Sequence, residues 1–188
     1  MQANPPALAA ALFAQGPAPD RAGKMDLYAW LIGSWDFDMV EYQPGGGEQR
    51  RLGEWHFGWV LEGRAIQDVW IVPPRGARAG TRGEDVAAQE NYYGSTLRTY
   101  DPRLDAWRIQ WTDPVSQRYF DMIGRKEGER IVQNGKLPDG TPLRWSFSDI
   151  ASDSFTWRSE VSMDGGKTWS RNVEFFARRA RSGESQAE

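Results

Sequence analysis

The chain has 188 residues, a formal net charge of −3 and no Cys. This length fits one well-filled domain rather than two, and the interleaved acidic and basic residues leave no cationic face for phosphates, so nucleic acid is not an expected partner. The lack of Cys excludes disulfides, thiolate metal sites and thiol nucleophiles, and no apolar run approaches the roughly 20 residues that span a bilayer, so no membrane span is expected.

The first segment, residues 1–23, is rich in Ala and Pro and is expected to be flexible, with one short helix around residues 7–13. It contains an apolar patch, but no Lys or Arg precedes the patch and two Pro residues interrupt its start. A secretory signal needs a basic start followed by a continuous apolar run. The segment is therefore a poor signal, and the cytoplasm is the expected location.

A second short helix, in "MDLYAWLIG", leads into a long region in which hydrophobic residues alternate with polar ones. Ten strands are predicted there, most of them separated by tight turns with Gly, Pro or Asp. Their ranges are 35–43, 49–61, 64–72, 92–100, 105–112, 117–126, 129–135, 142–150, 154–163 and 168–178. One connection differs from the others, because residues 73–90 form a long polar loop that is either disordered or a lid over a site.

Strands joined by short turns pair in an antiparallel way, and ten of them close most readily into a barrel, because closure removes the unpaired edges. The expected fold is therefore all-β: a ten-stranded antiparallel up-and-down barrel with a short N-terminal helix, over residues 24–180, followed by a disordered tail at 181–188. Aromatic residues share one face of each strand, as Trp55, Phe57 and Trp59 do, and this face is expected to point into the lumen.

The most patterned stretch, "SMDGGKTWS" at residues 162–170, fits the Asp-box signature Ser-x-Asp-x-Gly-x-x-Trp of sialidase-type propellers. Propellers repeat this box from blade to blade, whereas this chain contains it once, so a glycan-processing propeller is not expected. We interpret the stretch as a hairpin turn. In this interpretation Asp164 accepts bonds from turn N–H groups, Gly166 takes a positive φ and Trp169 packs under the hairpin.

The start of the strand region, "LIGSWDF", contains Gly33-Ser34-Trp35, which resembles the Gly-x-Trp opening of the lipocalin-like (calycin) barrels. The segment from Met25 to Arg179, with "WVLEGRAIQDVW", "LRTYDP" and "DAWRIQW", is similar to uncharacterised bacterial lipocalin-like proteins of the DUF1579 type. The resemblance implies a barrel in which a helical turn precedes the first strand and Trp35 plugs one end. Members of this superfamily bind hydrophobic ligands, haem or fatty acids, and a few catalyse isomerisation or hydration, so the fold leaves the function open.

The segment "GRAIQDVW" contains the charged residues of the candidate site. Ile66 and Trp70 are expected to point inward, and alternation then places Arg64 and Asp68 in the lumen as well. Charged side chains inside a small barrel must be paired, solvated or functional. Arg64 either forms a buried structural pair with Asp68 or Glu41, or it binds the carboxylate or polar head of a ligand while Asp68 accepts a hydrogen bond.

The body of such a ligand would contact an aromatic wall. The candidate ligand-binding residues are therefore Arg64, Asp68, Trp70, Glu41, Trp55, Trp107, Trp111 and Trp157. Aromatic side chains can fill the lumen of a barrel near eight strands, but ten strands leave more room, which favours a cavity.

Three function classes agree with this pattern. We favour binding of a small, largely apolar ligand with a polar or anionic end. The second class is a lipocalin-like isomerase, cyclase or hydratase that uses Asp68 or Glu41 as general acid/base, and the third is a protein-interaction module with an exposed apolar face. The sequence assigns no catalytic residue, and it leaves the oligomeric state open, a homodimer included.

No metal or other cofactor is expected. His56 is the only histidine, and alternation places it opposite Trp55 and Phe57, on the outer face of its strand. The chain contains no cluster of residues with metal-ligand spacing.

Overall fold

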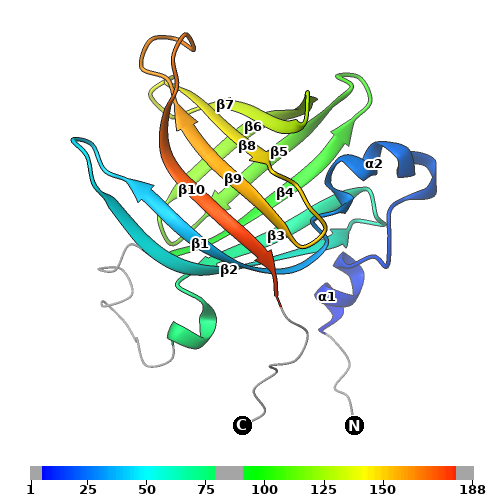
Figure 1. Ribbon diagram of the computed structural model, residues 1–188. Coiled ribbons are helices and arrows are strands. Elements are labelled where there is room, and N and C mark those ends of the chain that lie inside the picture. The colour runs from blue at the N-terminus through cyan, green and yellow to red at the C-terminus, as the bar shows by residue number, and fades with distance from the viewer. Residues whose placement is uncertain (1–5, 79–90, 181–188) are drawn as a thin grey trace.

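The computed structural model describes residues 6–78 and 91–180 as a closed β-barrel with short helical elements at its side and at one end. Ten antiparallel strands follow one another around the wall, and the last returns to pair with the first (Figure 1). The strands are β1 (Gly33–Tyr42), β2 (Glu48–Val60), β3 (Ala65–Val72), β4 (Tyr92–Asp101), β5 (Ala106–Asp113), β6 (Arg118–Glu127), β7 (Arg130–Lys136), β8 (Pro142–Ser148), β9 (Ser154–Val161) and β10 (Ser170–Arg179). The all-β, ten-stranded up-and-down barrel is therefore confirmed, and every strand end lies within two residues of its predicted position.

Strand β2 illustrates how the residue pattern determines the wall. Trp55, Phe57 and Trp59 are 2%, 6% and 8% exposed, whereas His56 and Gly58 between them are more accessible. Successive side chains of a strand point to opposite faces, so the large rings enter the lumen and the alternate positions face outward. The outward position predicted for His56 is confirmed.

The N-terminal segment is attached to the barrel wall. Helix α1 (Ala7–Leu12) is followed by hydrogen bonds from Leu61 N to Leu12 O (2.9 Å), from Ala14 N to Trp59 O (2.9 Å) and from Ala18 N to the carbonyl of residue 63 (3.0 Å). Over residues 12–18 this segment is thus held by the end of β2 and the turn that follows, in contrast to the flexible segment expected at 1–23. The expected tail, 181–188, lies outside the described residues.

Helix α2 (Ala22–Ala29), which follows the 3-10 turn η1 (Pro19–Arg21), closes one end of the barrel (Figure 1). Its Met25 and Tyr28 and the following Leu31 have no exposed surface. The Tyr28 hydroxyl accepts a hydrogen bond from Gln133 Nε2 of β7 at 2.9 Å. Burial raises the pKa of Tyr28 to about 12, so the helix inserts a neutral phenol into the lumen.

Trp35 closes the same end, as the Gly-x-Trp resemblance implies. Its indole N–H donates to Leu31 O at 2.7 Å, and the guanidinium of Arg179 lies 3.9 Å from the centre of its ring. Arg179 also donates to the carbonyls of Ile32 (2.6 Å) and Trp30 (2.5 Å). The last strand therefore ties the first strand to the segment that follows α2.

Aromatic rings from opposite walls meet in the middle of the lumen. Ring centroids lie 5.3 Å apart for Trp70 of β3 and Phe175 of β10, 5.6 Å for Trp111 of β5 and Trp145 of β8, and 6.1 Å for Trp55 of β2 and Phe147 of β8. Such pairs contribute about 0.5–1.5 kcal/mol each beyond the area they bury. The middle of the lumen is thus filled by rings, where the strand number favoured a cavity.

The Asp-box hairpin joins β9 to β10 as the predicted turn. Asp164 Oδ1 accepts hydrogen bonds from Lys167 N (3.0 Å) and Thr168 N (2.8 Å), and Gly166 has a φ of 96°. Hydrogen bonds from the Thr168 hydroxyl and backbone hold the pKa of Asp164 down to about 2. Trp169 packs against the hairpin base, where the Arg144 guanidinium lies 3.8 Å from the centre of its ring.

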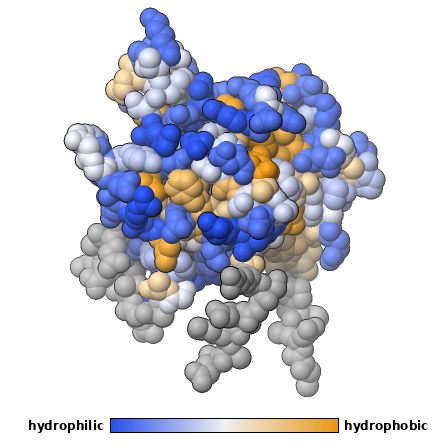
Figure 2. All heavy atoms as spheres, viewed as in Figure 1, coloured by the Kyte–Doolittle hydropathy of each residue, from blue (hydrophilic) through white to orange (hydrophobic). Residues whose placement is uncertain are grey.

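Hydrophilic residues cover most of the face shown in Figure 2, with smaller hydrophobic areas between them. Exposed apolar residues of this scattered kind are ordinary on protein surfaces. None of the helices in the described ranges is long and apolar enough to cross a bilayer.

Candidate functional site

An ion pair between Asp68 and Arg98 lies inside the barrel. Both residues are 1% exposed, and Arg98 Nη1 donates to Asp68 Oδ2 while Thr96 N donates to Asp68 Oδ1 at 3.2 Å. The rings of Phe57 and Tyr28 lie 5.5 and 5.6 Å from the guanidinium carbon. Burial raises the pKa of the Asp68 carboxyl, and the charge of Arg98 opposes this rise.

Arg64 lies outside the lumen, so the prediction that it shares the interior with Asp68 is wrong. Its side chain is 43% exposed, and its Nη1 donates to Asp20 Oδ2 at 2.9 Å. Neither predicted pair, with Asp68 or with Glu41, is formed. The physical reason is that β3 begins one residue later: Arg64 belongs to the turn after Leu61, which has a positive φ, and strand alternation does not extend into that turn.

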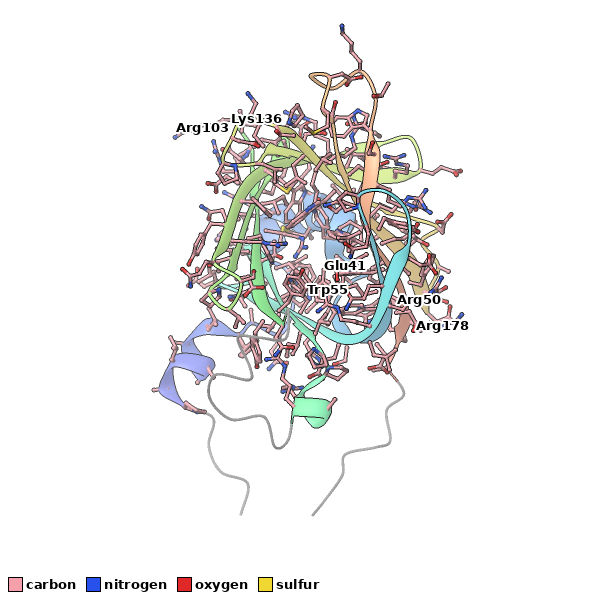
Figure 3. All side chains as sticks on the ribbon, turned by 90° about the vertical axis from the view of Figure 1, so that its left-hand side faces the viewer. Glu41, Arg50, Trp55, Arg103, Lys136 and Arg178 are labelled. Atoms are coloured by element: carbon pink, nitrogen blue, oxygen red, sulfur yellow. The ribbon has the colours of Figure 1, made fainter. Side chains whose placement is uncertain are left out.

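Glu41 lies at the barrel end remote from α2, in a polar rim with Arg51 and Tyr92. Arg51 Nη2 donates to Glu41 Oε2, and the Tyr92 hydroxyl donates to Glu41 Oε1 at 3.0 Å. The guanidinium carbons of Arg51 and Arg118 lie 5.0 and 5.7 Å from the centre of the Tyr92 ring. In Figure 3, Glu41 and Trp55 point into the space enclosed by the strands.

Beneath this rim, four rings from neighbouring strands stack side by side. The centroid distances are 5.2 Å between Tyr92 and Trp70, 5.6 Å between Trp70 and Trp111, and 5.1 Å between Trp111 and Phe120, with interplanar angles of 22°, 26° and 17°. We call these four residues the rim stack. The rim stack forms an apolar wall of nearly parallel rings that leads from the polar rim into the lumen.

The other candidate residues are divided between the two ends and the middle of the barrel. Trp107 lies at the α2 end, where its ring centroid is 4.8 Å from that of Tyr28. Trp55 and Trp157 lie in the middle, 6.2 Å apart. Of the predicted set, the structure thus brings together Glu41, Trp70 and Trp111.

Sequence reasoning missed the partners of the predicted residues. The residue pattern left open whether Arg50 or Arg51 faces outward; Arg51 points inward beside Glu41, because the register opposes it to the inward-facing Met39. Arg98, Tyr92 and Arg118 lie in strand segments without a clear apolar face, so alternation gave no signal for them. Only the pairing of each strand with its neighbour identifies them.

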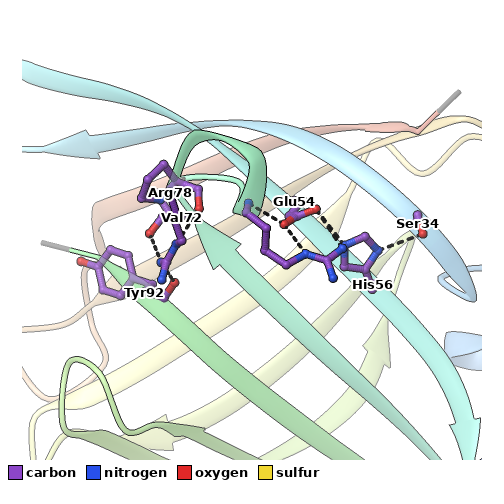
Figure 4. Close-up of polar contacts among 8 residues, drawn as sticks. Ser34, Glu54, His56, Val72, Arg78 and Tyr92 are labelled. Carbon is purple, nitrogen blue, oxygen red and sulfur yellow. Dashed lines mark hydrogen bonds and ion pairs between the residues drawn. The ribbon is translucent and has the colours of Figure 1, made fainter. Parts of the chain in front are cut away.

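A polar cluster on the outer face anchors η2 (Arg75–Arg78), the start of the long loop (Figure 4). His56 contacts Ser34 Oγ through Nδ1 at 2.9 Å and Glu54 Oε2 through Nε2 at 3.1 Å, and Arg75 donates to Glu54 Oε1 at 2.8 Å. Burial alone would raise the pKa of Glu54, but hydrogen bonds from Arg75 lower it to about 2.

The lid or disorder expected for the long loop falls largely on residues 79–90, which lie outside the described residues. Within the described ranges, no group of three or more His, Asp or Glu residues could hold a metal ion.

An open groove of about 1190 Å³ lies at the α2 end, beside the β4–β5 and β6–β7 turns. Leu27, Trp30 and Trp107 contribute its apolar surface. The polar groups that line it are partly paired with one another, since Lys24 Nζ donates to Asp105 Oδ1 at 2.7 Å. This groove has a mixed lining and lacks a stacked wall of the kind found at the rim.

No protein-family model and no curated protein matches this chain. Among solved structures, the barrel is similar to Rv2717c from M. tuberculosis, with a TM-score of 0.56 and 13% identity over 88% of this chain and 99% of that chain. It is also similar to the S-type phycobiliprotein lyase CPES from Guillardia theta, with a TM-score of 0.55 and 12% identity over 89% of this chain and 100% of that chain. At these identities the likeness shows the fold alone, a closed ten-stranded antiparallel barrel, and the lipocalin-like (calycin) superfamily stays what the sequence resemblance implies. The narrower DUF1579 assignment stays a prediction.

Proposed function

We propose that the protein binds a small, largely apolar molecule with an anionic or polar end, at the barrel end formed by the polar rim and the rim stack. The observation that carries the proposal is the row of four stacked rings beneath a rim of charged side chains. Small-molecule sites are typically lined by aromatic and aliphatic side chains, with a few polar groups that orient the ligand. The rim stack supplies the first part and the rim supplies the second.

The charges at the rim favour an anionic end. The Glu41 carboxylate is already bound by Arg51 and by the Tyr92 hydroxyl. Asp113 Oδ1 of β5 accepts hydrogen bonds from Val115 N at 2.9 Å and Ser116 N at 3.2 Å in the next turn, and Oδ2 has no hydrogen-bond partner within the described residues. Among the described residues, Arg118 faces the Tyr92 ring and has no carboxylate within ion-pair distance. A ligand anion beside Arg118 would gain a charge-assisted hydrogen bond.

Catalysis by a lumen carboxylate has less support. A general acid or base must reach the proton that it transfers. Asp68 is 1% exposed, and both of its oxygens accept hydrogen bonds, from Arg98 and Thr96. Glu41 is likewise held by two partners. We therefore propose binding rather than an isomerase, cyclase or hydratase activity.

We also propose that the chain is related to the uncharacterised lipocalin-like proteins of the DUF1579 type. The Gly33-Ser34-Trp35 opening and the "GRAIQDVW" segment support this assignment. The likeness to the phycobiliprotein lyase, at 12% identity, concerns the barrel only and carries no lyase activity to this chain.

Two matched probes test the proposal. 8-Anilinonaphthalene-1-sulfonate is anionic, and N-phenyl-1-naphthylamine has the same rings without the sulfonate. Titration followed by probe fluorescence should show saturable binding of both to the wild type. Arg118→Gln should weaken the binding of the sulfonate probe about tenfold and leave the affinity for the neutral probe unchanged. Tenfold is near the lower end of the effect of a hydrogen bond to a charged group, because Arg118 is exposed.

Arg130→Gln is the matched control, because it removes the same charge from an exposed position at the α2 end of β7. It should change neither affinity. Trp70→Ala should weaken both probes. The absence of saturable binding of either probe to the wild type would refute the proposal, and an equal loss in Arg118→Gln and Arg130→Gln would refute the role of the rim.

A further inference from the structure

The rim stack contains a buried hydrogen-bond donor without a partner. Trp111 is 4% exposed, and its indole N–H forms no hydrogen bond within the described residues. Buried polar groups in proteins are nearly always hydrogen-bonded, so an unpaired one suggests a group that binds there.

Gly94 of β4 lies directly against this donor and against the indole N–H of Trp70. A Cβ atom at position 94 would lie 2.7 Å from Trp111 Nε1 and 3.1 Å from Trp70 Nε1. The φ of Gly94 is not in the left-handed region, so the strand does not require glycine for its backbone conformation. Its lack of a side chain instead lets the two indole nitrogens converge closely on its backbone. We call Gly94, Trp70 and Trp111 the indole cradle.

We infer that the indole cradle binds a hydrogen-bond-accepting oxygen of the ligand. The ligand is then a flat aromatic acid with a carbonyl or similar neutral oxygen in its apolar body, in addition to its anionic end. This inference rests on the proposed function, because it concerns the same end of the barrel. It adds a second polar point of recognition inside the aromatic wall.

The charge of the donors determines which part of the ligand binds at the indole cradle and which part binds at the rim. The cradle offers two neutral N–H donors among aromatic rings, which would not compensate the loss of water around a carboxylate. The rim offers the guanidinium of Arg118, so the anionic end belongs there. A neutral carbonyl oxygen suits the cradle, and the small angles within the rim stack suit a flat ring system.

A pair of probes that differ in one oxygen tests the inference. 9-Oxofluorene-2-carboxylate has a ring carbonyl, and fluorene-2-carboxylate has a methylene group in its place. Calorimetric titration of the wild type should show about tenfold tighter binding of the keto acid, which is the effect of one or two neutral hydrogen bonds. Trp111→Phe keeps a ring and removes the N–H, so it should reduce this preference to less than about twofold.

Trp157→Phe is the matched control, because it removes another buried indole N–H that has no partner within the described residues. It should keep the tenfold preference. Gly94→Ala places a methyl group in the cradle and should also abolish the preference. Circular dichroism and the melting temperature identify any variant that fails to fold. If Gly94→Ala does not fold, the result for Trp111→Phe alone tests the inference.

The outcomes separate this inference from the proposed function. Equal affinity of the wild type for the two acids would overturn the inference and leave the binding function standing; the cradle would then hold water only. Failure of both acids to bind, with the naphthylamine probes still bound, would overturn it as well. Failure of all four probes would remove the proposed function itself.

Discussion

Arg98→Met should destabilise the protein strongly at neutral pH, because it leaves the Asp68 carboxyl inside the barrel without its cation. Both residues are 1% exposed, and without Arg98 the carboxyl keeps only neutral donors, among them Thr96 N at 3.2 Å. Keeping a carboxyl with an ordinary pKa of 3.8 protonated at pH 7 costs about 4.4 kcal/mol. This value agrees with the roughly 3–5 kcal/mol typical of a buried pair that loses one partner.

The loss of stability in Arg98→Met should depend on pH. A carboxyl whose pKa is raised in the folded state contributes stability below its unfolded pKa of 3.8, and this stability is lost as the pH rises. The deficit of Arg98→Met should therefore shrink by about 1.4 kcal/mol for each pH unit between pH 7 and pH 4. The double variant Asp68→Leu/Arg98→Met should regain stability to within about 2 kcal/mol of the wild type, because neither charge remains buried.

Urea unfolding followed by tryptophan fluorescence measures these differences as shifts in midpoint at constant slope. Arg64→Met is the control, because it breaks an exposed pair with Asp20 and should leave the midpoint unchanged. A loss below about 1 kcal/mol in Arg98→Met at pH 7, or a deficit that does not vary with pH, would show that the buried ion pair is not formed as described.

Four further expectations concern the Asp-box turn, the α2 end and cofactors. Gly166→Val forces a β-branched residue to a φ of 96° and should cost about 1 kcal/mol or more in chemical unfolding, without affecting probe binding. The pKa of Asp164 is lowered from 3.8 to about 2, so its contribution is lost as the pH falls between these values, and the acid unfolding profile of Asp164→Asn should be flatter there. Gly124→Ala brings a methyl group to 2.5 Å from the buried Tyr28 hydroxyl and should lower stability by about 1–3 kcal/mol, whereas Gly76→Ala, which meets nothing within 4 Å, should not. Freshly purified protein should contain no stoichiometric iron or zinc by elemental analysis and show no Soret band; either signal contradicts the expectation that no metal or haem is needed.

The strands were predictable because their signal is local. In β2, β5 and β9 large apolar side chains recur at every second residue, and tight turns mark both ends of most strands. Up-and-down order then follows from short connections, and closure follows from the number of strands. Each of these steps uses residues that are close in the sequence.

The candidate site was only partly predictable because its contacts join distant strands. Asp68 was correctly placed in the lumen, but its partner is 30 residues away, across the long loop between β3 and β4. Thr96, Arg98 and Tyr100 are alternate residues of β4 and therefore share one face of the strand. Because all three are polar or amphipathic, the sequence does not indicate that this face is buried. The predicted inward position of Arg64 was wrong for a local reason: strand alternation was applied to Arg64, which lies one residue before the start of β3.

The crowded indoles of the lumen give this protein an intrinsic spectroscopic reporter. The ring centroids of Trp70 and Trp111 are 5.6 Å apart, and those of Trp145 and Trp157 are 5.2 Å apart. Ultraviolet transitions of rings at such separations couple, and coupled transitions in a chiral arrangement give paired positive and negative bands in circular dichroism. Loss of this couplet should therefore record the separation of the rings, while the amide signal records the strands independently. Ligand entry at the rim could thus be followed in the unlabelled protein.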